Sequence, residues 1–431
     1  MQMMSFREEN FWLTTLPSPA PDSTPPLPEK VDVVVIGGGF TGLSAARQLA
    51  QRGARVAVLE AMRPGWGASS RNGGMVLTGL KLGVETLLAR YGRDLTRRMF
   101  AASLAAIDCV ETIVKSENIA CDFARSGHLE VAYKPAHYAH FQRNAELMVK
   151  EFNHPVRVIP KAGLGAEIGS PIYHGGLVDD VSAGVNPARY VAGLAEAARR
   201  AGALLVNRTR VNNVERLNGH YRVTTDRGSL NAHQVFVATS GYTSAATPAL
   251  RKKIIPIGSF IIVTDPLPER LAREVSPCAR MIFDSKNFLY YFRLTPDQRM
   301  LFGGRAAFRP ETASTVRDSA HILRAGMLTV YPQLKDVAVK FVWGGTLDFA
   351  FDLMPHAGGQ DGLYYALGYA GHGVALATYL GAQMARAMLG EAVDNPFAAV
   401  PFPGAPLGLY DGRPWFLPLA GAWYKFLDWM S

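Results

Sequence analysis

VDVVVIGGGFTG, residues 31–42, joins a run of β-branched residues to a glycine-rich turn. The run has no polar alternation, which predicts a central strand of a parallel sheet that is covered on both faces. In the turn, Gly37 allows a tight bend, Gly39 lets the backbone approach a pyrophosphate, and Gly42 permits close packing of the next helix. The stretch therefore predicts a dinucleotide-binding turn whose phosphates lie at a helix N-terminus.

The residues after this turn complete a strand–helix–strand unit. FTGLSAARQLAQRG (40–53) has apolar residues at helical spacing and ends at Gly53, and ARVAVLE (54–60) is a second buried strand. Glu60, at the end of that strand, is placed to accept hydrogen bonds from ribose hydroxyls. An acid at this position disfavours NADP and leaves FAD or NAD. A structural glycine turn beside a surface glutamate is the alternative.

A second stretch of small residues, GWGASSRNGG (65–74), follows Glu60 closely. Glycine and alanine leave room for a ligand, whereas a simple nicotinamide domain would continue here into another helix and strand. Ser69, Arg71 and Asn72 can donate to flavin or phosphate oxygens. The stretch therefore favours FAD over NAD, with a purely structural loop as the alternative.

The composition indicates a large globular protein. Its 431 residues, 48% of them hydrophobic, exceed the usual size of one compact domain. The net charge of +9 comes from basic residues spread along the chain, so we expect mild attraction to anionic ligands and no nucleic-acid binding. No apolar run has the length of about 18–20 residues that spans a bilayer, and the polar N-terminus lacks a signal-peptide core. We therefore expect a soluble, cytoplasmic protein.

Cysteine usage and the two ends of the chain add to this picture. Cys109, Cys121 and Cys278 are widely spaced and odd in number, which predicts neither disulfides nor a metal site and fits a reducing compartment. Residues 17–29 are rich in proline and predict an extended arm. PWFLPLAGAWYKFLDWM (414–430) predicts a docked C-terminal segment, with a membrane or partner contact as the alternative.

The middle of the chain contains two kinds of predicted strand. Buried strands at 234–241 and 362–368 resemble the first unit, whereas FLYYFRL (288–294) and RMLFGG (299–304) alternate as in an antiparallel sheet. The chain is therefore predicted to leave a parallel-sheet domain twice and to return to it. The predicted division is an N-terminal arm (1–29), an FAD-binding domain (30–85, 151–245 and 335–400), a substrate domain (86–150 and 246–334) and a C-terminal segment (401–431).

Several motifs point together to one family. The glycine turn is followed by GASSRNGG, WGGTLDF (343–349) and GYAGHGVALAT (368–378), with FWLTTLP and VFVATSGYT elsewhere. With these motifs the chain resembles the D-amino acid oxidase superfamily of FAD-dependent oxidoreductases, which includes glycine and sarcosine oxidases, and is most similar to the branch with γ-glutamylputrescine oxidase. The resemblance implies a fold of the α/β and α+β classes. A glutathione-reductase-like FAD-binding Rossmann domain is interleaved with an antiparallel-sheet substrate domain, and the isoalloxazine lies at their junction.

The resemblance also implies which residues contact FAD. The glycine turn would hold the pyrophosphate, Glu60 the ribose and Val211 the adenine, although Val211 has an ordinary strand position as its alternative. The implied cofactor contacts are Gly37, Gly39, Phe40, Thr41, Gly42, Glu60, Ala61, Gly67, Ala68, Ser69, Arg71, Asn72, Gly73, Gly74, Met75, Val211, Ala238, Thr239, Ser240, Gly344, Gly371, His372, Gly373 and Val374.

Two departures from sarcosine oxidases bear on the substrate. Those enzymes hold the substrate carboxylate with a basic residue two positions after the GHG motif, where this chain has Ala375, and with an arginine that has no counterpart in GGMVLTG (73–79). An unpaired carboxylate in a closed site is costly, so an amine without an α-carboxylate is favoured. Arg293 is the candidate that would bind a carboxylate instead, with a salt bridge at the edge of the core as its alternative.

The same comparison concerns attachment of the flavin. Sarcosine oxidases attach FAD through a cysteine in the strand that reads KFVWGGTLDFAF (340–351) here, and none of the three cysteines lies in it. The resemblance therefore implies non-covalent FAD. Trp343 either stacks beside the flavin or belongs to the core.

Two further residues complete the catalytic candidates. Tyr291 is predicted in an aromatic-rich substrate pocket with Tyr290, Phe260, Met75 and Trp343, or in plain core. His372 is predicted at a helix N-terminus, where it contacts or orients the flavin in preference to acting as a catalytic base.

The implied reaction is oxidation of a primary or secondary amine. A hydride passes from the carbon bearing nitrogen to flavin N5, and oxygen reoxidises the flavin with release of hydrogen peroxide. A dehydrogenase of amines or amino acids that passes electrons to quinone or another carrier is the alternative, and a non-enzymatic electron-transfer flavoprotein is a remote one. The sequence does not indicate the substrate or the oligomeric state.

Overall fold

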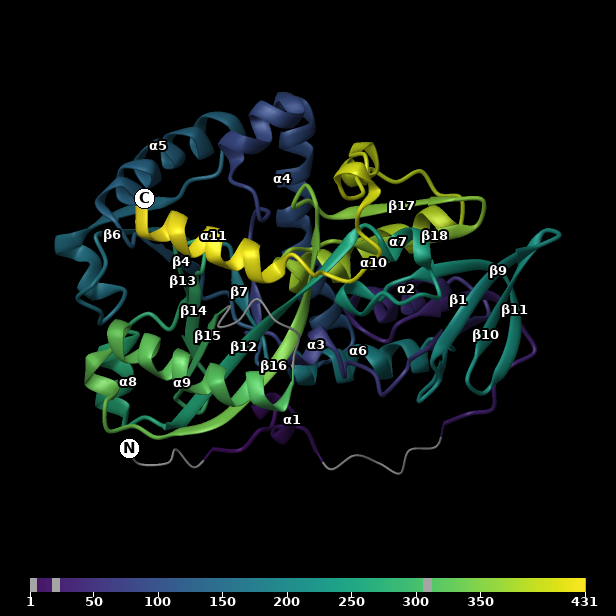
Figure 1. The fold of residues 1–431 in the computed structure, drawn as a ribbon, viewed down its shortest axis with the longest axis horizontal. Helices are drawn as coiled ribbons and strands as arrows, with labels where there is room; N and C mark the ends of the chain where they lie inside the picture. The colour runs from purple at the N-terminus through teal and green to yellow at the C-terminus, as the bar shows by residue number, and fades with distance from the viewer. Residues whose placement is uncertain (1–5, 18–23, 305–311, 431) are drawn as a thin grey trace.

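Two large sheets lie side by side in the structure, a computed structural model that describes residues 6–17, 24–304 and 312–430 (Figure 1). The first sheet has the order β17-β18-β11-β1-β2-β8, in which the strands from β18 to β8 are parallel and β17 pairs with β18 in antiparallel fashion. Strands β9 and β10 extend the sheet from β11, also antiparallel. Its strands are β1 (Lys30–Ile36), β2 (Val56–Leu59), β8 (Leu204–Val206), β9 (Val211–Leu217), β10 (His220–Thr225), β11 (Gly228–Val237), β17 (His356–Gln360) and β18 (Leu363–Leu367).

The second sheet has the order β16-β12-β15-β14-β13-β4-β6-β5 and is antiparallel except between β4 and β13. A separate pair, β3 (Met75–Val76) and β7 (Ala183–Gly184), lies beside it. The strands of the second sheet are β4 (His128–Val131), β5 (Arg157–Pro160), β6 (Gly175–Asp179), β12 (Ile254–Pro266), β13 (Met281–Asp284), β14 (Tyr290–Leu294), β15 (Arg299–Gly304) and β16 (Val339–Ala350).

Helices cover both sheets (Figure 1). The glycine turn opens the helix that follows β1, and the GHG motif opens the helix that follows β18. The helices are α1 (Phe11–Thr14), α2 (Phe40–Ala50), α3 (Ala68–Arg71), α4 (Val84–Ser116), α5 (Pro135–Phe152), α6 (Pro187–Arg200), α7 (Pro248–Arg251), α8 (Glu269–Val275), α9 (Ala313–Val330), α10 (Gly373–Met388) and α11 (Leu417–Met430).

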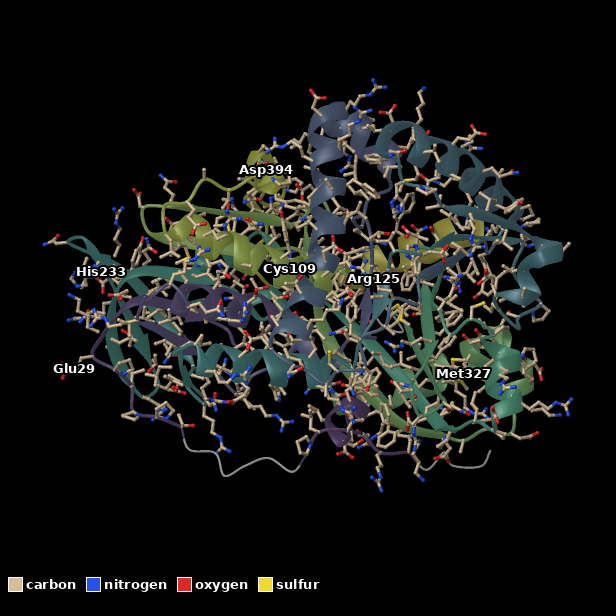
Figure 2. The ribbon with its side chains drawn as sticks, turned by 180° about the vertical axis from the view of Figure 1, so that it is seen from behind. Glu29, Cys109, Arg125, His233, Met327 and Asp394 are labelled. Carbon is tan, nitrogen blue, oxygen red and sulfur yellow. The ribbon has the colours of Figure 1, made fainter. Side chains whose placement is uncertain are left out.

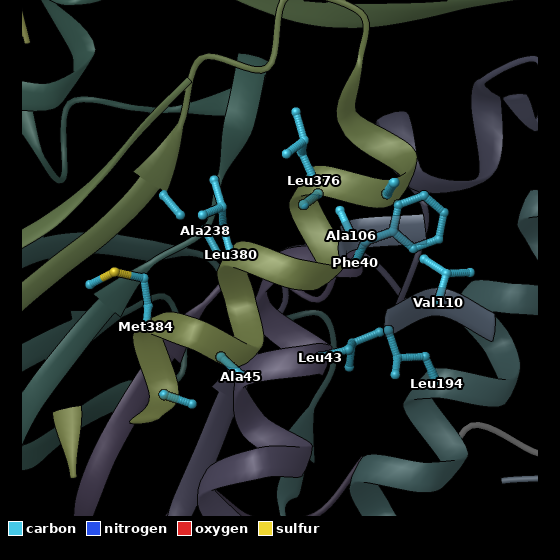
Figure 3. Packing of buried hydrophobic residues seen from close by; sticks show 14 of the residues in the cluster. Phe40, Leu43, Ala45, Ala106, Val110, Leu194, Ala238, Leu376, Leu380 and Met384 are labelled. Carbon is cyan, nitrogen blue, oxygen red and sulfur yellow. The ribbon is translucent and has the colours of Figure 1, made fainter. Parts of the chain in front are cut away.

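A continuous core joins the helices that begin at the two glycine motifs. Leu376, Leu380 and Met384 recur every four residues on α10 and are buried against α2, with Ala238 at the end of β11 beside them (Figure 3). The cluster also takes in residues of α4 and α6. Because both N-termini belong to one packed unit, their separation is fixed by apolar contacts.

The fold class predicted from the sequence is confirmed, because a largely parallel sheet and a largely antiparallel sheet are both present. Sheet membership differs from the predicted division at three strands. The ranges 151–245 and 335–400 were predicted to belong to the FAD-binding domain, and they contain β5, β6 and β16. All three strands nevertheless pair in the second sheet. β16 pairs with β12 from Ile254↔Ala350 to Thr264↔Val339. A buried strand has the same local pattern in either sheet, so only its pairing partner reveals this membership.

The C-terminal segment ends in α11. Leu417 at its start is buried and packs with Ile257 of β12 and Phe349 of β16, whereas Trp415 and Leu419 are exposed. Within the described ranges, no helix is both long enough and apolar enough to cross a membrane. Residues 18–23 of the predicted proline arm lie outside the described residues.

The three cysteines are free and lie in different environments. Cys121 is buried, Cys278 is exposed, and Cys109 lies half-buried on α4 (Figure 2). Burial raises the pKa of the Cys109 thiol to about 11 and that of the Cys121 thiol to about 12. Both thiols are therefore protonated and weakly nucleophilic at neutral pH.

Candidate active site

A first cavity of about 250 Å³ opens at the carboxyl ends of β1, β2 and β11. This is the edge of a parallel sheet at which ligands bind in doubly wound folds. Its walls include many of the residues expected to contact a dinucleotide, namely Gly37, Gly39, Phe40, Thr41, Glu60, Ala61, Gly67, Ala68, Ser69, Asn72, Val211, Ala238, Thr239, Ser240, Gly371, Gly373 and Val374.

The glycine turn is held by close backbone contacts. Gly37 has a φ of +107°, and a Cβ there would lie 2.7 Å from the carbonyl oxygen of Ala238. A Cβ on Gly42 would lie 2.0 Å from the carbonyl oxygen of Gly37, although Gly42 does not line the cavity. Helix α2 then begins at Phe40 with Gly39 as its N-cap, and the backbone N–H of Phe40 donates to Ser69 Oγ at 3.0 Å. Its N-terminus faces the cavity, where it attracts an anion.

Glu60 links the end of β2 to the glycine turn. Its Oε2 accepts from the backbone N–H of Gly38 at 2.7 Å, and its Oε1 accepts from that of Met62 at 2.9 Å. Burial raises the pKa of Glu60, against these two bonds and the charge of Arg210. The carboxylate lines the cavity, where its remaining lone pairs can accept from hydroxyl groups.

Two indoles fix the loop of small residues. Trp12 Nε1 donates to the carbonyl oxygen of Asn72 at 2.9 Å, and Trp343 Nε1 donates to that of Arg71 at 3.1 Å. Arg71 in turn donates to the carbonyl oxygen of Gly344 at 2.9 Å. Trp343 is buried and lines neither cavity described here, so in this structure it occupies the core position and holds the loop.

Arg293 also contacts this loop. It is buried, and its Nη1 donates to the carbonyl oxygens of Gly74 and Val185, each at 3.1 Å. Burial lowers the pKa of Arg293 to about 10, so the guanidinium is charged at neutral pH. Among the described residues no carboxylate forms a salt bridge with Arg293, and the residue lines neither cavity. The structure therefore places Arg293 behind the loop, away from the walls of both cavities.

A second cavity of about 640 Å³ lies between this loop and the second sheet. It is lined by Tyr291 and His372, together with Arg71, Gly73 and Met75 of the loop region. Tyr291 packs against Gly73, where a Cβ would lie 3.1 Å from its ring, and its hydroxyl lies 3.1 Å from Ser259 Oγ. Phe260 and Trp343, predicted in the same aromatic pocket, are instead buried in separate core clusters.

The two cavities share one part of their walls. Ala68, Asn72, Leu347, Gly371 and Val374 line both. An elongated ligand can therefore pass from the glycine turn to the second cavity. A dinucleotide with a planar group at one end fits this arrangement, because its phosphates would meet the α2 N-terminus and its ring system the shared wall.

His372 is the N-cap of α10 and lines the second cavity, next to Gly371 of the shared wall. Its side chain does not cap the helix, and its Nδ1 is buried without a hydrogen-bond partner among the described residues. Burial, with the nearby charge of Lys81, lowers the pKa of His372 to about 3. The imidazole is therefore neutral at physiological pH and retains hydrogen-bonding capacity for a ligand.

Asp348 is a functional candidate that the sequence did not single out. Its Oδ2 accepts from the backbone N–H of Gly368 at 2.7 Å, and its carbonyl oxygen accepts from Ala370 N at 2.9 Å. Burial raises the pKa of Asp348 to about 6, although bonds from Gly368 and Ser240 oppose the shift. The residue fixes the turn that leads into α10. The signal in the sequence that could have identified Asp348 is its position as a lone acid inside the apolar strand WGGTLDF.

The polar wall of the second cavity was also missed. It comes from three neighbouring strands of the second sheet and from the chain before α4. The local signal for two of these residues was the alternation in GHLEVAY (127–133), which places His128 and Glu130 on the same face of a strand. The residues concerned are Lys81, His128, Glu130, Asp179 and Asp284.

Comparison with known proteins places this site in a family. A family model described as FAD dependent oxidoreductase (DAO) matches residues 32–387. The chain belongs to this family. The probable oxidoreductase OrdL of Haemophilus influenzae is 34% identical over 375 residues, which are 85% of each chain. The gamma-glutamylputrescine oxidoreductase of Escherichia coli is 31% identical over 400 residues, which are 92% of each chain.

Solved structures agree with the DAO assignment at the level of the fold. The glycine oxidase from Geobacillus kaustophilus has a TM-score of 0.74 at 20% identity and covers 88% of this chain and 100% of that chain. The L-proline dehydrogenase from P. horikoshii has a TM-score of 0.68 at 22% identity, with 85% and 95% covered. The predicted family is confirmed. This DAO-family protein is an FAD-dependent oxidoreductase, and its family implies an amine-type substrate and an electron acceptor.

Proposed function

We propose that this chain oxidises a primary or secondary amine at the C–N bond and that oxygen is the final acceptor. The chemistry that FAD supplies is acceptance at N5 of a hydride from the carbon bearing nitrogen, followed by return of two electrons to oxygen as hydrogen peroxide. The neutral amine becomes an imine, and water hydrolyses the imine to a carbonyl compound and an amine or ammonia.

The observation that carries this proposal is the shared wall of the two cavities. There the N-terminus of α10, which no side chain caps, meets the loop of small residues, and the neutral His372 lines the second cavity beside it. A helix N-terminus stabilises negative charge that develops on a bound ring system. The second cavity lies directly beyond this wall and has room for a small amine.

Peroxide release separates oxidase from dehydrogenase activity. The purified holoprotein is mixed in air with a panel of primary and secondary amines, and oxygen uptake and hydrogen peroxide are measured together. We expect one hydrogen peroxide per oxygen consumed and per carbonyl formed. Bleaching that persists in air and that a quinone dye reverses would replace the oxidase with the dehydrogenase alternative.

The exposed C-terminal side chains favour that second candidate. Trp415, Leu419 and Trp423 are each more than half exposed, at 66%, 71% and 56%. Aromatic and apolar side chains of this kind bind at a membrane interface, where quinones reside. A membrane contact through this segment belongs to the dehydrogenase alternative, and vesicle co-sedimentation with and without anionic lipid tests it.

For the oxidase, we propose a location in the reducing cytoplasm, which fits the three free cysteines.

We propose that FAD is bound without a covalent bond. None of Cys109, Cys121 and Cys278 lines either cavity, and the thiols of Cys109 and Cys121 are protonated at neutral pH. Acid precipitation of the holoprotein should therefore release all of the flavin into the supernatant. Yellow colour that remains with the washed precipitate would contradict this prediction.

We propose that the predicted contacts along the first cavity hold FAD and that His372 contacts the flavin. Replacement of His372 with alanine should weaken FAD binding or shift the flavin potential, with a smaller effect on turnover of the FAD-loaded enzyme. Flavin titration, redox potential and kcat are measured on the same preparation. An inactive variant with normal affinity and potential would assign His372 the role of catalytic base instead.

A further inference from the structure

Glu130 lies on the wall of the second cavity and not on the wall shared with the first. It belongs to β4, where the parallel register with β13 places it opposite Phe283 and the antiparallel register with β6 places it opposite Leu177. Phe283 and Leu177 also line the cavity. A carboxylate is therefore presented to the cavity between two apolar side chains.

The Glu130 carboxylate has no direct partner within the part of the chain that the structure describes. Among the described residues, no hydrogen bond or salt bridge reaches it, and Lys81 and Asp284 act on it only through space. Glu130 is half-buried, and a carboxylate that has lost part of its hydration is stabilised by a donor that pairs with it. A ligand with hydrogen-bond donors and positive charge would supply what the protein does not.

The other acids on this wall already have hydrogen-bond or salt-bridge partners. Asp179 accepts from Thr78 at 2.7 Å and contacts His154 Nε2 at 2.8 Å. Asp284 forms a salt bridge with Lys286 at 3.0 Å. Among the acids that line the cavity, Glu130 therefore differs from Asp179 and Asp284 in having no direct partner among the described residues.

We infer that Glu130 binds a second cationic group of the substrate, at a distance from the carbon that is oxidised. The inference rests on the proposed amine oxidation and names its substrate class: an amine that carries another ammonium group farther along the molecule. One amine would face the shared wall at His372, and the second would donate to Glu130 from within the cavity. A charge-assisted hydrogen bond of this kind is stronger than a neutral one.

A substrate comparison tests the inference on the FAD-loaded enzyme. Straight-chain diamines with three to six carbons are compared with the monoamines of equal length. The best diamine should have a kcat/KM at least about tenfold above that of its monoamine, as expected for one charge-assisted hydrogen bond. The variant Glu130→Gln should lose this preference through a higher KM for the diamine, whereas its kinetics with the monoamine stay close to wild type.

Glu146→Gln is the matched control, because Glu146 is exposed on α5 and does not line the cavity. It should keep the wild-type preference for diamines. Equal kcat/KM for diamine and monoamine in the wild type, with flavin reduced by both, would overturn the inference and leave the proposed function intact. Failure of every amine to reduce the flavin would instead remove the proposed function.

Thermal stability without substrate gives an independent readout. Burial, with the charge of Asp284, raises the pKa of Glu130 to about 7 from its ordinary 4.5, against the charge of Lys81. A raised pKa means that the folded state loses stability as pH rises from about 4.5 to about 7. The other charged or titratable groups that line this cavity are Arg71, Lys81, His128, His140, Asp179, Asp284, Lys286, Tyr291 and His372.

Glu130→Gln removes this pH dependence. The variant should therefore melt at a higher temperature than wild type, with a larger gain at pH 8 than at pH 5. A variant that melts lower than wild type at pH 8 and keeps the diamine preference would show that Glu130 is a structural partner of Lys81, which contradicts the inference.

Discussion

Replacement of Gly42 with alanine should abolish FAD binding and lower the stability of the apoprotein. A Cβ at this position would lie 2.0 Å from the carbonyl oxygen of Gly37 and 3.0 Å from a methyl group of Val35. The first clash is with backbone, so a change of side-chain rotamer does not relieve it. We expect a cost of about 3 kcal/mol, at the upper end of the usual range for overpacking.

The measurements for Gly42→Ala are thermal unfolding and titration with FAD. Gly165→Ala is the matched control, because Gly165 is exposed and a Cβ there has nothing within 4 Å. The control should bind FAD like wild type. Since Gly42 does not line the cavity, normal FAD affinity in Gly42→Ala would show that the close approach of α2 to the turn does not position the phosphate site.

Replacement of Arg293 with methionine should produce the second large effect. The variant leaves the carbonyl oxygens of Gly74 and Val185 buried without their donor. An unsatisfied buried acceptor costs about 1–3 kcal/mol, so we expect a loss of about 2–4 kcal/mol in the free energy of unfolding. FAD affinity should fall as well, because Gly74 ends the loop of small residues.

Denaturant unfolding and FAD titration test the Arg293→Met variant. Arg222→Met is the control, since Arg222 is exposed on β10 and should tolerate the same change. Arg293→Lys keeps the charge and should recover part of the stability. Normal stability and FAD affinity in Arg293→Met, together with a raised KM for amines that carry a carboxylate, would contradict the structural role and restore the role in substrate binding that the sequence suggested.

The FAD side of the fold could be predicted because its signals are local. The glycine turn, β1, α2 and β2 are contiguous in sequence, and Glu60 and the loop at 65–74 follow directly. The helix N-terminus predicted at His372 lies there in the structure, where His372 is the N-cap of α10. These features depend on turn chemistry and periodicity, which one sequence contains.

The substrate side could not be predicted in the same way because it depends on strand pairing. Glu130, Asp179 and Asp284 meet only because β4 pairs with both β6 and β13. Arg293 was predicted to bind a substrate carboxylate or to form a salt bridge, but its hydrogen-bond acceptors come from a loop far away in the sequence. Non-local contacts of this kind leave no periodic trace in either segment.

The most direct test of amine oxidation at this site is an anaerobic titration of the FAD-loaded protein. Amines from the panel are added without oxygen, and the visible flavin absorbance and the carbonyl product are followed. We predict that one equivalent of a suitable amine bleaches one equivalent of flavin and yields one equivalent of carbonyl compound. A flavin that dithionite bleaches but that no primary or secondary amine reduces would contradict the proposed function.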